Sequence, residues 1–141
     1  MIDTLVLPPA LHGQLIDQAR AAFPRECCGL VEGTLMCTEA RVLAVHASPN
    51  LATAIDRFEI DHRLQFALSR RLRGSGREII GCYHSHPNGH PVPSPRDAEM
   101  AREPGFLWLI VALGGPTGVV SLSASVKTGA GFLPLRFANV A

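Results

Sequence analysis

The pattern that most constrains this chain is a pair of histidines, two residues apart, at the end of an apolar segment. Residues 77–86 read REIIGCYHSH, which is typical of a strand, and Pro87 follows them. Side chains two apart on a strand point to the same face, with Cα atoms about 6–7 Å apart. His84 and His86 can therefore lean onto one ion, although such a pair alone is more often a packing feature.

A proline-rich loop follows the histidines and leads into the start of a helix. Pro91, Pro93 and Pro95 restrict the loop, and Ser94-Pro95-Arg96-Asp97 is typical of a helix N-terminus, with Ser as the cap and an acid at the third position. If the loop returns the chain to the histidines, Asp97 adds an oxygen ligand. Three protein ligands with the fourth position open to water are the pattern of a catalytic zinc site, whereas structural sites close with four.

Two other side chains near the histidine pair are alternative ligands. Cys82 lies on the same strand face but about 13 Å along the strand from His86, so we place it in the core. His90 lies within the loop and competes with Asp97. We favour Asp97 because a mobile loop histidine is a less economical partner for the strand pair.

Together these residues resemble the signature of a metallopeptidase family. H-x-H, seven intervening residues and S-x-x-D are similar to the motif of the JAMM (MPN-plus) zinc metallopeptidases, in particular the short stand-alone prokaryotic type. Residues 26–33 (ECCGLVEG) resemble that family's early strand, which opens with a Glu. Residues 108–111 (WLIV) resemble the strand after the motif, so the resemblance extends over roughly residues 24–113.

The resemblance implies a reaction and a role for each site residue. His84, His86 and Asp97 would bind one catalytic zinc ion, and the water held by that zinc would be the nucleophile. Glu26 would be the general base that accepts its proton, and Ser94 would stabilise the oxyanion of the tetrahedral intermediate.

The resemblance also implies a substrate. Only ten residues separate Asp97 from Trp108, which leaves little room for the insertions by which eukaryotic relatives grip ubiquitin chains. We therefore expect a zinc-dependent isopeptidase or peptidase that hydrolyses an amide bond at the C-terminal Gly-Gly tail of a ubiquitin-like sulfur-carrier protein. The alternatives are a catalytically inert MPN scaffold and a cell-wall or phage-tail type of JAMM peptidase. A zinc deaminase is disfavoured because the H-x-E and P-C-x-x-C signatures are absent.

Hydrophobic periodicity predicts an α/β fold with a mixed sheet flanked by helices, in a single domain over residues 1–141, and the resemblance implies a cytidine-deaminase-like arrangement. We expect helices at about 9–22, from Asp61 to Gly74, and from Ser94. A turn is expected at Gly33, because glycine often marks one. Strands or extended segments are expected at about 3–7, 27–33, 35–37, 41–47, 57–60, 77–86, 106–113, 118–125 and 132–137.

Composition and charge limit which partners and which cellular compartment we expect for this protein. A net charge of +1 gives no reason to expect a nucleic acid or a membrane as partner, and the longest apolar run, residues 106–113, is too short to cross a bilayer. The N-terminal residues lack a basic region and contain two prolines, which is unlike a signal peptide. We therefore expect a cytoplasmic protein whose four cysteines are reduced and mostly buried.

Overall fold

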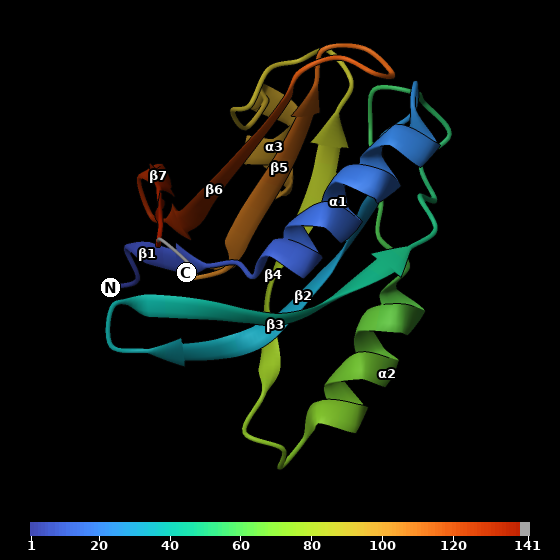
Figure 1. Cartoon of the computed structure of the whole chain (residues 1–141). Helices are drawn as coiled ribbons and strands as arrows, with labels where there is room; N and C mark the ends of the chain where they lie inside the picture. Colours follow the sequence, from blue (N-terminus) through green and yellow to red (C-terminus); the bar gives the residue numbers. More distant parts are fainter. Residues whose placement is uncertain (139–141) are drawn as a thin grey trace.

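A computed structural model describes residues 1–138 and shows one sheet with helices packed on both of its faces (Figure 1). The helices are α1 (Pro9–Ala22), α2 (His62–Leu72) and α3 (Pro95–Met100). The strands are β1 (Thr4–Val6), β2 (Cys28–Met36), β3 (Glu39–Ser48), β4 (Glu78–His86), β5 (Leu107–Leu113), β6 (Val120–Thr128), β7 (Gly131–Pro134) and β8 (Arg136–Phe137).

The order of the strands makes the sheet mixed, as predicted. Within the described residues the order is β7-β6-β5-β4-β2-β3-β1-β8. β4 runs parallel to β5, and β1 runs parallel to β3 and β8, whereas the other neighbours are antiparallel. That residues 1–141 form a single domain stays a prediction, and residues 139–141 lie outside the described part.

Each face of the sheet carries its own hydrophobic core. Alternation along β5 sends Leu107, Leu109 and Val111 to the face covered by α1, where Leu15 of α1 is fully buried. The opposite face packs against α2, and the histidines of β4 point to that side. The core of this second face comprises Cys28, Leu30, Phe58, Leu68, Leu72, Cys82, Ala101 and Trp108.

The predicted helix starts are confirmed at both positions where a cap was expected. Asp61 caps α2, because its side chain accepts a hydrogen bond from the backbone N–H of Arg63 at 3.0 Å. Ser94 caps α3, and Pro95 occupies its first helical position, where a missing N–H costs nothing.

The expected turn at Gly33 is wrong. β2 continues to Met36, and the chain turns only after it, at Cys37, whose φ is +56°. The register with β3 shifts between Glu32 and Gly33, and a Cβ at Gly33 would overlap the carbonyl of Arg41. The glycine therefore serves a close approach of two backbones at a bulge, not a reversal of the chain.

The structure refines two other expectations. The short extended stretch expected at 57–60 lies in the loop at 49–61 and contributes one isolated bridge between Asn50 and Ile60. Residues 132–137 are divided into β7 and β8, which lie at opposite edges of the sheet.

The cysteines largely agree with the prediction that they are reduced and mostly buried. All four cysteines are free thiols, and Cys82 is buried in the core as predicted, although Cys27 is only partly buried and Cys37 is exposed. None of the helices in residues 1–138 is both long and apolar enough to cross a membrane.

A pair of glycine substitutions tests the strand packing. A methyl group at Gly29 would overlap the His46 carbonyl and the Tyr83 ring, so Gly29→Ala should lower the free energy of unfolding by about 1–3 kcal/mol. At Gly13, inside α1, the added carbon meets no neighbouring element within 4 Å in the described structure. Gly13→Ala should therefore stabilise by about 0.5–1 kcal/mol, because Ala loses less backbone entropy. Urea denaturation measures both, and equal effects would contradict this packing.

Candidate active site

Three side chains converge at the end of β4. The Nε2 atoms of His84 and His86 lie 2.8 Å apart, and Asp97 Oδ2 lies 3.0 Å from the first and 3.1 Å from the second. All three residues are buried. The structure therefore brings together the three residues that the sequence singled out, which come from β4 and from α3.

Asp97 is held in this position by the helix cap. Its Oδ2 accepts a hydrogen bond from the Ser94 backbone N–H at 2.9 Å, and the Ser94 hydroxyl oxygen accepts one from the Asp97 N–H at 3.0 Å. Burial alone would raise the pKa of Asp97, but hydrogen bonds from His84 and His86 outweigh it and hold that pKa well below its ordinary value. The capping box thus places the Asp97 carboxylate next to the histidines. Asp97 can therefore be part of the helix cap and a metal ligand at the same time.

Packing holds the His84 ring. The ring stacks on Phe58 with centroids 4.2 Å apart and an angle of 18°, and meets Trp108 edge-on at 5.8 Å. Its Nδ1 is buried and has no hydrogen-bond partner in residues 1–138, which is unusual for a metal-ligating histidine. Burial in these apolar surroundings lowers the pKa of His84, so its ring favours the neutral form that binds metals.

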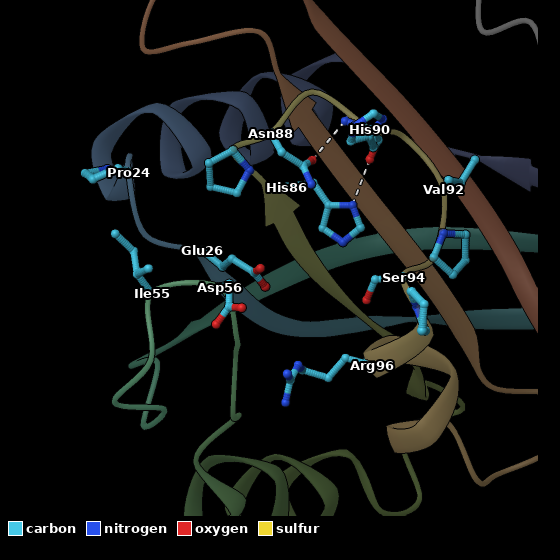
Figure 2. Close-up of a pocket in the computed structure, with 13 residues that line it drawn as sticks. Pro24, Glu26, Ile55, Asp56, His86, Asn88, His90, Val92, Ser94 and Arg96 are labelled. Carbon is cyan, nitrogen blue, oxygen red and sulfur yellow. Dashed lines mark hydrogen bonds between the residues drawn. The ribbon is translucent and has the colours of Figure 1, made fainter.

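A hydrogen bond orients the His86 ring. Its Nδ1 donates to the backbone carbonyl of His90 at 2.7 Å (Figure 2). This bond directs Nε2 toward Asp97. Burial lowers the pKa of His86, but the Asp97 carboxylate and the His90 carbonyl outweigh it and the net direction is upward. His90, the alternative ligand, lies outside the converging group, and its contribution is this carbonyl.

The converging atoms can hold a metal ion. In a tetrahedral zinc site with ligands at about 2.0–2.1 Å, neighbouring ligand atoms are roughly 3.3 Å apart. The separations of 2.8–3.1 Å in this structure are only slightly shorter, so a small outward movement of the side chains suffices. Two imidazoles and one carboxylate form a donor set that suits zinc, and three ligands leave one position open.

Glu26 lies beside this group, directly before β2. Its side chain is buried and lines the same pocket as His86. Figure 2 shows the Glu26 carboxylate and the Ser94 hydroxyl on opposite sides of His86. Burial raises the pKa of Glu26 to about 7, with the nearby His86 acting in the opposite direction. A carboxylate with such a pKa is suited to accept a proton near neutral pH.

The pocket is an open cleft of about 640 Å³ between two loops. One wall comes from the 49–61 loop, and the other from the proline-rich loop and the start of α3 (Figure 2). Its lining residues are Pro24, Glu26, Ile55, Asp56, His86, Pro87, Asn88, His90, Val92, Pro93, Ser94, Pro95 and Arg96. The lining combines apolar side chains with charged ones, which suits a peptide better than a small apolar ligand.

Sequence reasoning missed the residues that support the site. Phe58 was assigned to an extended stretch and given no role, yet it stacks on His84. Ser85 was treated only as the spacer between the histidines. Its N–H donates to the Cys27 carbonyl at 3.0 Å, and its hydroxyl oxygen accepts from the Cys27 N–H at 2.8 Å, which fixes the residue next to Glu26. No local signal reveals these partners, because they are distant in the sequence.

A model of the prokaryotic homologs of the JAB domain matches residues 8–125, a range that contains Glu26 and the three converging side chains. The chain belongs to this family. The match confirms the resemblance to prokaryotic JAMM proteins that the sequence indicated. The fold is likewise shared with the solved structure described next over nearly the whole chain, which confirms the predicted fold class of a mixed sheet flanked by helices.

Three proteins illustrate the similarity of this JAB-domain chain to others. A desampylase of Haloferax volcanii is 35% identical over 65% of this chain and 66% of its own length. A probable TtuB-protein conjugate cleaving protease of Thermus thermophilus is 33% identical over 62% and 60%, respectively. This chain thus matches slightly less than two thirds of either relative. A solution structure from Desulfitobacterium hafniense, 26% identical, covers 95% of this chain and 91% of its own with a TM-score of 0.83.

The raised pKa of Glu26 predicts how stability depends on pH in the presence of a chelator. Between pH 4.5, the ordinary value, and about 7, the folded protein keeps a proton on Glu26 that the unfolded chain releases. The wild type therefore loses stability as the pH rises through this window. Glu26→Gln does not titrate, so its stability relative to wild type should increase from pH 4.5 to 7 and then stay constant. Urea denaturation at several pH values measures this, and a constant difference would mean an ordinary pKa.

Proposed function

We propose that this protein is a zinc-dependent isopeptidase or peptidase that hydrolyses an amide bond at the C-terminal Gly-Gly tail of a ubiquitin-like sulfur-carrier protein. The observation that carries the proposal is the convergence of His84, His86 and Asp97 beside a buried acid, Glu26, in an open pocket. Three ligands with an adjacent proton acceptor are what metal-assisted amide hydrolysis requires.

We assign His84, His86 and Asp97 as the ligands of the zinc. A zinc ion bound in this way lowers the pKa of water to about 7 and polarises a carbonyl group. Phe58 and the His90 carbonyl hold the two imidazoles so that both Nε2 atoms face Asp97. These two contacts are present without the ion, so little conformational entropy is lost when the metal binds.

Glu26 is assigned as the general base and Ser94 as the oxyanion donor. Glu26 accepts a proton from the attacking water on one side of His86 and passes it to the leaving amine. The Ser94 hydroxyl oxygen already accepts a hydrogen bond from the Asp97 N–H. Its own proton is therefore free to donate into the pocket, toward the oxygen on which negative charge develops.

The substrate assignment rests on the relatives and on the shape of the pocket. The Thermus relative is described as cleaving TtuB-protein conjugates, and the Haloferax relative as a desampylase. The cleft lies between two loops and is lined by several prolines, and a tail ending in two glycines, which carry no side chains, can approach such walls closely. The complete set of ligands and the buried Glu26 weigh against an inert scaffold.

The test of the activity uses Glu26→Gln as a matched control. The zinc-loaded wild type should release the leaving group from a Gly-Gly-ending carrier joined to it by an amide bond, measured by mass spectrometry. Glu26→Gln should bind one zinc per chain and cleave at least about 100-fold more slowly, because it lacks the proton acceptor. Absence of cleavage by the wild type would contradict the substrate, and full activity of the variant would contradict the role of Glu26.

The ligand set is tested by calorimetric titration with zinc. Asp97→Ala should weaken zinc binding by more than about 100-fold, since losing even an outer partner of a ligand costs about 10–100-fold. His90→Ala should bind zinc like the wild type, because the substitution keeps the carbonyl that orients His86. The opposite result, with His90→Ala deficient and Asp97→Ala intact, would replace Asp97 by His90 in the ligand set.

A further inference from the structure

One side chain, Asn50, organises the wall of the pocket next to Glu26. Its amide nitrogen donates to the carbonyl of Glu26 at 3.0 Å and to that of Arg57 at 2.9 Å. Its amide oxygen accepts from the N–H groups of Ala52 and Glu59, both at 3.0 Å. A carboxamide has two donors and two acceptor sites, so Asn50 uses its full hydrogen-bonding capacity.

The first of these bonds bears on the proposed base. Within residues 1–138 no hydrogen bond holds the Glu26 carboxylate, so its position depends on the backbone that carries it. Glu26 also precedes β2, and its carbonyl has the Asn50 side chain as its partner. Ser85 fixes the next residue, Cys27, from the other side. The backbone at residues 26–27 is therefore held by Asn50 on one side and by Ser85 on the other.

Two of the other bonds bear on a histidine. Asn50 binds the carbonyl of Arg57 and the N–H of Glu59. These two residues flank Phe58 in the chain. Phe58 is buried and stacks on His84. By holding the backbone on both sides of Phe58, Asn50 fixes the ring that supports His84. A single side chain thus connects the proposed base to the support of a proposed ligand.

We propose that Asn50 is a positioning residue that sets the carboxylate of Glu26 relative to the histidine pair, an inference that rests on the function proposed above. Without the two donors of Asn50, the Glu26 carbonyl bonds to water, and the carboxylate loses its fixed distance from the attacking water. Misplacement of a reacting group by about 1 Å costs about 100-fold in rate. The ligands themselves stay in place, because the α3 cap holds Asp97 and the His90 carbonyl holds His86. His84 is fully buried on β4 and keeps its contact with Trp108 in addition to Phe58.

The experiment compares Asn50→Ala with Arg25→Ala. Arg25 donates to the Ala52 carbonyl at 2.8 Å, so it anchors the same loop without contacting the Glu26 carbonyl. On the conjugate described above, Asn50→Ala should lower kcat about 100-fold, leave KM within about threefold and bind one zinc per chain. Arg25→Ala should keep kcat within about threefold of wild type. Asn50→Ala added to Glu26→Gln should cause little further loss, because both act through the same carboxylate.

A crystal structure of zinc-loaded Asn50→Ala decides the positioning independently of turnover. We expect a displaced or disordered Glu26 carboxylate with unchanged histidines, and an unchanged Glu26 in Arg25→Ala. If Asn50→Ala does not fold, Asn50→Asp keeps both acceptor bonds and replaces the donors by a charged oxygen that faces the carbonyls of Glu26 and Arg57, with the same expected results. Wild-type kcat with Glu26 in place, loss of zinc, or equal impairment of Arg25→Ala would each overturn the inference. Absence of cleavage by the wild type would refute the proposed function while the crystal structures still decide the role of Asn50.

Discussion

The site depends above all on the antiparallel register of β2 with β4. This register pairs Cys28 with His84, so Glu26, two residues earlier, arrives beside His86 at the end of the sheet. A slip of one residue would turn every side chain of β2 to the opposite face and separate Glu26 from the histidines. Gly29 and Gly81 allow the close contacts in this part of the sheet, since a Cβ at either would overlap a neighbouring strand. The same strand register therefore determines both the packing of the core and the position of Glu26 in the pocket.

The electrostatics of the converging group follow from that geometry. Two imidazole nitrogens 2.8 Å apart repel each other unless a proton or a cation lies between their lone pairs. Burial against Phe58 keeps His84 neutral, whereas Asp97 and the His90 carbonyl favour a proton on His86. A metal ion has to displace that proton, so its affinity decreases in acid. Asp97 stays charged in either case, because the cap and both histidines stabilise its carboxylate.

The sequence allowed prediction of those features whose signals are local. The spacing of His84, His86 and Asp97 reflects the period of a strand and a helix cap, and both were confirmed. Gly33 was misinterpreted because a glycine marks a turn and a close backbone approach equally well. Phe58, Asn50 and Ser85 were not recognised because each contacts a residue of the site, or its neighbour, that is 24 or more residues away in the chain. Only the pairing of strands brings those groups together, and no local pattern encodes it.

The two walls of the pocket are held by different means, and this difference suits the proposed substrate. The proline-rich wall is stiff because prolines 91, 93 and 95 have fixed φ angles. The 49–61 wall has no regular structure and is held by hydrogen bonds that converge on Asn50. Ile55 and Asp56, at the tip of this wall, are exposed and carry no part of the core. Substitutions at the tip can change which tail the cleft accepts without moving the backbone of Glu26, because Asn50 holds the loop at its base.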